Sequence, residues 1–189
     1  MDGVTRVIAG VAGGRRLAVP SGRDTRPTSD RAREGLFATV HALLGPLAGL
    51  RVADLYAGSG AVGLEALSRG AAHALLVESR PRAARVIRAN IDALGMPGAE
   101  LLADRVERVL RGSPAAPYDL IFADPPYTMP AAEVTAMLEA LRDNGWPAAD
   151  ALVVVERATR TGPLDWPAGY GADRDRRYGE GTLWYGRPV

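Results

Sequence analysis

The residues with the clearest chemical potential form the tetrapeptide Asp124-Pro125-Pro126-Tyr127, which directly follows an apolar segment at residues 118–123. In an open α/β sheet, ligands bind outside the carboxyl ends of the strands. The Asp124 carboxylate and the Pro125 carbonyl could accept both hydrogens of an exocyclic amino group and so release its lone pair. Prolines fix φ and hold such acceptors in place, while Tyr127 could stack on an extruded base. The turn predicts chemistry on a base amino group; the alternative is an aspartate that caps the following helix.

A glycine-rich turn at residues 52–67 (VADLYAGSGAVGLEAL) predicts a second ligand site. Gly58, Gly60 and Gly63 have the spacing of dinucleotide-binding loops, in which the missing Cβ atoms let a ligand approach the backbone. Glu78 lies twenty residues beyond Gly58 and ends the next strand, where a carboxylate can bind a ribose diol. This pattern alone fits both NAD and S-adenosylmethionine.

Asp54, at the end of the first of these strands, distinguishes the two ligands. A carboxylate there would face the pyrophosphate of NAD, but it suits the cationic methionine end of S-adenosylmethionine. Dehydrogenases also usually need a second domain for their substrate, and a chain of 189 residues has no room for one. We therefore expect S-adenosylmethionine, and only nicotinamide binding would restore an NAD-linked oxidoreductase.

Composition narrows the class of protein. Apolar residues make up 47% of the chain, which is enough for one sizeable core. With no cysteine and only His41 and His73 as imidazoles, we expect no metal site. We also expect a soluble, cytoplasmic protein without a membrane span, because the longest aliphatic stretch, Ala151 to Val155, is far below the roughly twenty residues needed.

The elements that must position these residues follow from hydrophobic periodicity and glycine stops. A hairpin is predicted within residues 4–20, a helix begins after the N-cap candidates Thr28, Ser29 and Asp30, and a terminal antiparallel hairpin covers residues 176–186. Regular alternation of strand and helix between them predicts a doubly wound α/β domain with a mostly parallel sheet. Its strands are expected at residues 51–55, 74–78, 100–103, 119–123 and 151–156, and its helices near 60–69, 81–94, 105–111 and 130–143.

Positive charge is concentrated at the N-terminus. Residues 1–33 carry seven arginines against three aspartates, whereas the net charge of the whole chain is only +1. A localised basic face can neutralise phosphates while the body of the protein stays near neutral. We expect part of this cluster to contact an RNA backbone, with ordinary solvated charge as the alternative; its members are Arg6, Arg15, Arg16, Arg23 and Arg26.

Four motifs together resemble a known family. They are RVIAGVAGGRRLAVP at residues 6–20, RPTSDRAREGLF at residues 26–37, DLYAGSGAVGLEALSRGA at residues 54–71, and the turn at residues 124–127. In this order they are similar to the bacterial 16S ribosomal RNA guanine-N2 methyltransferases. The resemblance implies a Rossmann-like class I S-adenosylmethionine-dependent methyltransferase fold, a mostly parallel seven-stranded sheet with a small N-terminal β-hairpin extension. It further implies an RNA-engaging extension at residues 1–27 and a methyltransferase domain at residues 28–189.

The resemblance also implies roles for individual residues. It makes residues 124–127 catalytic, adds Thr28 to the RNA-binding arginines, and implies action on 16S rRNA within the 30S subunit. We also expect a monomer, because nothing in the sequence suggests an obligate dimer. Its cofactor-binding residues are Asp54, Tyr56, Gly58, Gly60, Glu78 and Asp104.

Several alternatives stay open at this point. Asp104 could instead cap a helix, and Asn90 could either pack in its helix or reach back toward the catalytic turn. An adenine-N6 DNA methyltransferase would need a target-recognition domain for which the chain has no room. A non-catalytic RNA-binding assembly factor would not need both intact motifs.

Overall fold

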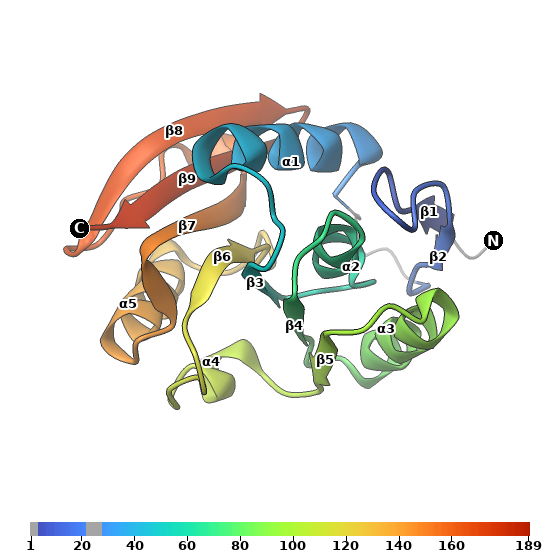
Figure 1. The fold of residues 1–189 in the computed structure, drawn as a ribbon. Coiled ribbons are helices and arrows are strands. Elements are labelled where there is room, and N and C mark those ends of the chain that lie inside the picture. The colour runs from blue at the N-terminus through green and yellow to red at the C-terminus, as the bar shows by residue number, and fades with distance from the viewer. Residues whose placement is uncertain (1–3, 22–27) are drawn as a thin grey trace.

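A seven-stranded sheet forms the centre of the computed structural model, which describes residues 4–21 and 28–189 (Figure 1). The strand order is β5-β4-β3-β6-β7-β9-β8. The first five strands pair in parallel, whereas β9 is antiparallel to both β7 and β8. The strands are β3 (Arg51–Leu55), β4 (His73–Val77), β5 (Ala99–Leu102), β6 (Tyr118–Ala123), β7 (Pro147–Ala158), β8 (Tyr170–Tyr178) and β9 (Gly181–Pro188).

Helices cover both faces of this sheet, as the alternating pattern predicted. Helices α1 (Asp30–Leu44), α2 (Ala61–Ser68) and α3 (Pro81–Leu94) lie along one face, and α4 (Val106–Val109) and α5 (Ala131–Asp143) lie along the other (Figure 1). Helix α1 begins where the Ser29 hydroxyl accepts a hydrogen bond from the Ala32 amide at 3.1 Å. In the described part of the chain, no helix is long and apolar enough to span a membrane.

The strands are apolar on both sides because each face is buried. Phe122 and Val154 point toward α1, α2 and α3, whereas their neighbours Ile121 and Val153 point toward α4 and α5. Successive side chains of a strand point to opposite faces, so a strand buried on both sides has a nearly continuous apolar sequence. This constraint explains why β3, β4, β5 and β6 could each be predicted within one residue.

Predicted boundaries were less accurate at the periphery. Strand β7 begins at Pro147 rather than at residue 151, because a register shift lets Pro147 pair with Tyr118 ahead of the regular ladder. The terminal hairpin spans residues 170–188 rather than 176–186, since β8 is an exposed, highly charged edge strand without an apolar pattern. Helix α4 is also shorter than expected.

The N-terminal hairpin packs directly on α2. Its strands are β1 (Val4–Arg6) and β2 (Arg16–Ala18), and its buried side chains Val7 and Leu17 join the main core. The buried Glu65 carboxylate of α2 accepts the Ile8 amide at 2.7 Å and the Ala9 amide at 3.0 Å. The predicted hairpin is therefore confirmed as an element, while the expected domain boundary at residue 27 lies outside the described residues.

A second buried carboxylate, Asp54, connects β3 to the first turn of α2. Its Oδ2 atom accepts the Gly63 amide at 2.9 Å beneath the glycine loop. Burial raises the pKa of Asp54 to about 8, an effect that the Gly63 hydrogen bond opposes and nearby Glu78 reinforces. The residue predicted to face a ligand thus also fixes the position of the helix that follows the loop.

Replacing Glu65 with glutamine tests the docking of the hairpin. The amide side chain would turn a donor toward one of the two backbone amides, and an unsatisfied buried donor costs about 1–3 kcal/mol. We expect Glu65→Gln to lower the free energy of unfolding by about 2 kcal/mol, measured by urea denaturation. The exposed Glu34→Gln on α1 is the matched control, and equal stability of the two variants would contradict the proposed docking.

The raised pKa of Asp54 predicts a pH-dependent stability. Because the folded state holds this proton more tightly than the unfolded chain, ionisation of Asp54 lowers stability as pH rises from about 4 to about 8. Asp54→Asn keeps an acceptor for Gly63 but cannot ionise, so wild type should lose stability relative to the variant across this window. The relative slope should not exceed about 1.4 kcal/mol per pH unit. Thermal unfolding at several pH values measures it, and a constant difference would contradict the prediction.

Candidate active site

The register of the parallel strands brings three acidic residues together at the carboxyl ends of the strands, which form one edge of the sheet. Leu55 of β3 pairs with Val77 of β4 and Ala123 of β6. Ala123 in turn pairs with Val155 of β7. Adjacent strands lie about 4.8 Å apart, so the residues that follow these partners are neighbours. The acids in this row are Glu78, Asp124 and Glu156.

The glycine loop lies at the same edge, between β3 and α2. Gly58 has φ +62°, and no atom lies within 4 Å of the place where its Cβ would be. Gly60 has φ +80°, and a Cβ there would meet the Leu76 side chain at 2.9 Å. The surface above Gly58 is therefore open to a ligand, whereas Gly60 is needed for close packing on β4.

Tyr56, at the start of this loop, is the non-glycine residue with positive φ (+61°) among the described residues. A bulky residue in this conformation is strained, and such strain is concentrated at functional sites. The Tyr56 hydroxyl donates to Glu107 Oε1 at 3.0 Å and so anchors the strained turn to α4.

Glu78 reaches the glycine loop from the end of β4. The side chain is buried, its Oε2 atom accepts the Gly58 amide at 2.9 Å, and its Oε1 atom accepts the Arg80 amide at 2.8 Å. The carboxylate predicted to hold a ribose thus lies directly beside the open surface above Gly58. A diol bound there would share or replace these backbone hydrogen bonds.

Asp104 follows β5 at the far end of the row. Its Oδ1 atom accepts the Arg105 amide at 2.7 Å and forms an ion pair with Arg108 at 3.5 Å. Arg105, not Asp104, occupies the N-cap of α4, so the helix-capping alternative is wrong. Asp104 is partly exposed after the end of β5, and its contact with a ligand stays a prediction.

The turn at residues 124–127 is held from both sides. The Asp124 amide donates to the Leu55 carbonyl at 3.3 Å, and the Met129 amide donates to the Pro126 carbonyl at 2.8 Å. Arg157 of β7 donates to the Met129 carbonyl at 2.8 Å and so supports the loop. Helix α5 has Pro130 as its N-cap, which shows that Asp124 does not cap it, and that alternative is also wrong.

Burial, and for Asp124 also neighbouring acids, raises the pKa values of two acids at this end of the sheet. The pKa of Asp124 is raised well above its ordinary value, first by partial burial and then by Glu156 and Asp54, while Arg80 opposes the shift. Burial likewise raises the pKa of Glu156, against hydrogen bonds from Thr28 and Tyr127. Carboxylates crowded in this way favour cations and hydrogen-bond donors as ligands.

Glu156 is the site residue that sequence reasoning missed. The Thr28 hydroxyl donates to its Oε2 atom at 3.0 Å and the Tyr127 hydroxyl to its Oε1 atom at 3.5 Å. Its signal in the sequence was an acid at the end of a predicted apolar strand. These side chains line a pocket of about 230 Å³, whose other lining residues include Arg31, Arg177 and Gly181.

The predicted RNA-binding arginines differ in their exposure and in their contacts. Arg6 is 63% exposed and pairs with Asp30 at 3.3 Å. Arg15 donates to the Ala93 and Leu94 carbonyls at the end of α3, which gives it a structural role, whereas Arg16 is exposed on β2. Arg23 and Arg26 lie outside the described residues.

Asn90 of α3 does not reach the Asp124–Tyr127 turn. Its side chain bonds both the amide and the carbonyl of Ala18 in β2 and donates to the Ser59 carbonyl in the glycine loop, each at 2.9 Å.

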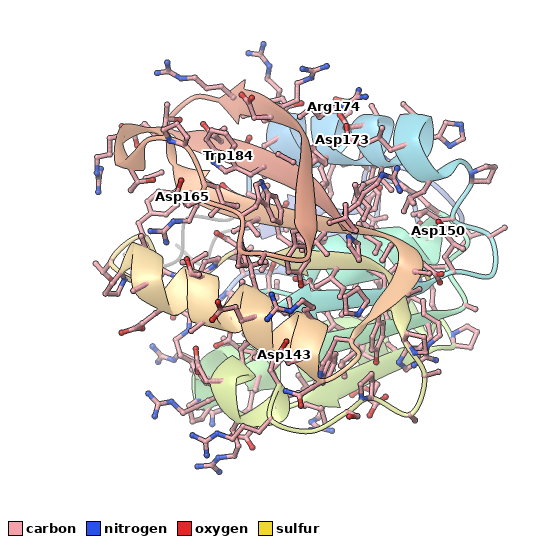
Figure 2. The ribbon with its side chains drawn as sticks, turned by 90° about the vertical axis from the view of Figure 1, so that its left-hand side faces the viewer. Asp143, Asp150, Asp165, Asp173, Arg174 and Trp184 are labelled. Carbon is pink, nitrogen blue, oxygen red and sulfur yellow. The ribbon has the colours of Figure 1, made fainter. Side chains whose placement is uncertain are left out.

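On the outer strand β8, Arg174 forms an ion pair with Asp173 at 2.9 Å beside α1 (Figure 2). Its charge is therefore partly neutralised.

The chain is similar in sequence and in fold to known methyltransferases. The chain is 36% identical over 179 residues to ribosomal RNA small subunit methyltransferase D of Escherichia coli strain K12, covering 95% of this chain and 87% of the relative. The solved structure of the Escherichia coli protein yhhF superposes with a TM-score of 0.85 at 31% identity, over 98% of both chains.

The fold is also that of more distant methyltransferases. Magnesium protoporphyrin IX methyltransferase from Synechocystis, solved with bound S-adenosylmethionine, matches with a TM-score of 0.63 at 15% identity, over 83% of this chain and 79% of the other. The predicted Rossmann-like class I methyltransferase fold is confirmed. The family model described as conserved hypothetical protein 95 matches residues 5–187. The chain therefore belongs to this family and is of the small-subunit ribosomal RNA methyltransferase D type.

Proposed function

We propose that the protein transfers a methyl group from S-adenosylmethionine to the N2 amino group of a guanine in 16S rRNA, acting as a cytoplasmic monomer on the 30S subunit. The observation that carries the proposal is the position of the Asp124–Tyr127 turn, which lies one strand from the glycine loop at the same sheet edge. Its support is the 36% identity to a relative named as a small-subunit rRNA methyltransferase.

The donor would lie over the glycine loop. The open surface at Gly58 leaves room for the methionine portion, and Glu78 beside it is suited to the ribose diol. Asp54 and Asp124 lie near this loop, and because their pKa values are raised, a cationic ligand would favour their ionised forms. We extend the cofactor site to Tyr56, Gly60 and Asp104. When bound, S-adenosylmethionine supplies a methyl group activated by its sulfonium charge.

The catalytic turn would prepare the acceptor nitrogen. The Asp124 carboxylate and the Pro125 carbonyl would accept the two hydrogens of the exocyclic amine, and Pro125 and Pro126 would keep these acceptors fixed. N2 gains the methyl group and loses one proton in the reaction. Because its pKa is raised, Asp124 is a stronger base than an ordinary carboxylate and is suited to receive this proton.

The N-terminal hairpin and the start of α1 would engage the RNA. Arg6 and Arg16 are exposed and can neutralise phosphates. Arg15 belongs to the same surface, but we give it a smaller part in RNA binding because its side chain bonds the end of α3. Thr28 would act at the pocket, where its hydroxyl bonds Glu156. In this proposal residues 1–27 form the RNA-engaging extension and residues 28–189 the methyltransferase domain.

Methyl transfer from labelled S-adenosylmethionine tests the reaction and the substrate together. Unmodified small subunits, free 16S RNA and DNA are each incubated with the protein, and the products are analysed by nucleoside mass spectrometry. We expect N2-methylguanosine on the small subunit. N6-methyladenine on DNA would replace the proposal with a DNA methyltransferase, and cofactor binding without transfer to any substrate would favour an assembly factor.

Two variants should separate catalysis from cofactor binding. Asp124→Asn removes the base while keeping the shape, so we expect kcat to fall by about 100-fold or more with unchanged S-adenosylmethionine affinity. Glu78→Ala removes a cofactor acceptor and should weaken that affinity by about tenfold or more, measured by calorimetry. Asp150→Asn, an exposed change near the amino end of β7 (Figure 2), is the control. Loss of cofactor binding in Asp124→Asn would show that its role is misassigned.

A further inference from the structure

Building on the proposed function, we propose that Glu156 selects the base: its carboxylate accepts the N1–H of the target guanine and thereby favours guanine over adenine. The base would enter the pocket lined by Thr28, Tyr127, Glu156 and Gly181. Glu156 lies outside the four sequence motifs.

The sheet register places Glu156 where the N1 position of the base should be. Asp124 and Glu156 each directly follow a member of the registered pair Ala123 and Val155 on adjacent parallel strands, so they stand about 4.8 Å apart along the row. Glu156 also contributes to the electrostatic field at Asp124. In guanine, N1 and the N2 amino group are bonded to the same carbon. A base whose N2 hydrogens point at Asp124 and Pro125 therefore presents N1–H toward the next acid in the row.

The surroundings of Glu156 hold it for such a contact. The residue is only 9% exposed, and the Thr28 and Tyr127 hydroxyls each donate to one of its oxygens. An ionised carboxylate offers about four acceptor positions, so lone pairs remain for a ligand. Gly181 leaves the space, because a Cβ there would lie 2.9 Å from Glu156 Oε1 and 3.1 Å from the Tyr127 hydroxyl.

The charge pattern of the pocket fits a nucleotide. Glu156 would meet the base edge. The lining also contains the exposed Arg31, Arg177 and Glu180, and phosphates of the target strand can pair with the two arginines. Guanine presents N1–H as a donor, whereas N1 of adenine is an acceptor. A buried carboxylate facing an acceptor forms no hydrogen bond with it, and N1 of adenine would lose its contact with water without gaining a donor, which disfavours binding.

A base analogue separates this role from a structural one. In 2-aminopurine the C2 amino group is retained, but N1 is an acceptor. Small subunits are reconstituted with 16S RNA that carries guanosine or 2-aminopurine at the methylated position, and the rates of methyl transfer are compared. Wild type should prefer guanine by between about tenfold and about 100-fold. Glu156→Gln can donate an amide hydrogen to N1 of 2-aminopurine, and it should reduce this preference at least about tenfold.

Two controls keep the test decisive. Glu139→Gln, an exposed change on α5, should keep the wild-type preference. Gly181→Ala should slow transfer to both bases equally, because its methyl group obstructs the pocket without changing a hydrogen bond. S-adenosylmethionine affinity and the melting temperature verify that each variant is folded.

The outcomes distinguish this proposal from the proposed function. An unchanged ratio in folded Glu156→Gln, or an equal loss of both rates, assigns Glu156 only to the support of Thr28 and overturns base selection while leaving guanine methylation intact. If wild type methylates no guanine on small subunits, the proposed function fails and base selection by Glu156 fails with it.

Discussion

Parallel pairing in register between β4, β3, β6 and β7 is the constraint on which the candidate site depends. Because the parallel ladders between the four strands end at the same level, the residues that follow the last parallel pairs lie in one row at the carboxyl end of the sheet. The chain places an acid in that row on three strands, separated by tens of residues in the sequence, and a glycine loop on the fourth. The sheet is rigid because both faces are buried, so the spacing of these groups is fixed before any ligand binds.

Burying several acids close together costs free energy, and hydrogen bonds from backbone amides and from Thr28 partly offset this cost. Gly63 donates to Asp54 and Gly58 to Glu78, and Thr28 donates to Glu156. These donors partly replace the water that burial removes. The raised pKa values show that the compensation is incomplete, and in the proposed reaction a sulfonium cation and the amino and imino hydrogens of a base would complement these acids.

The N-terminal hairpin is connected to the same loop through side chains that carry no chemistry of their own. Asn90 of α3 bonds Ala18 of the hairpin and Ser59 of the glycine loop, and Glu65 of α2 bonds two amides of the hairpin. The hairpin is thus joined to the glycine loop and to the helix that follows it by hydrogen bonds. Displacing the hairpin would leave these polar groups unsatisfied, so the two parts are mechanically coupled.

The sequence by itself determined the central strands, the helices of the doubly wound fold, and the two loops of the site. It could do so because continuous apolar strands, glycine spacing and the Asp124–Tyr127 turn are local signals that depend on burial and backbone geometry. It did not determine which acids meet across the sheet. Glu156 was visible only as the end of a strand, and its proximity to Asp124 and Thr28 follows from strand register and from the position of α1 over β7. Nor could it show that Arg15 bonds the end of α3 or that Asn90 bonds the glycine loop. Those contacts join residues 31 to 128 positions apart, and only tertiary packing decides such pairs, because the local sequence carries no information about which distant backbone will lie against it.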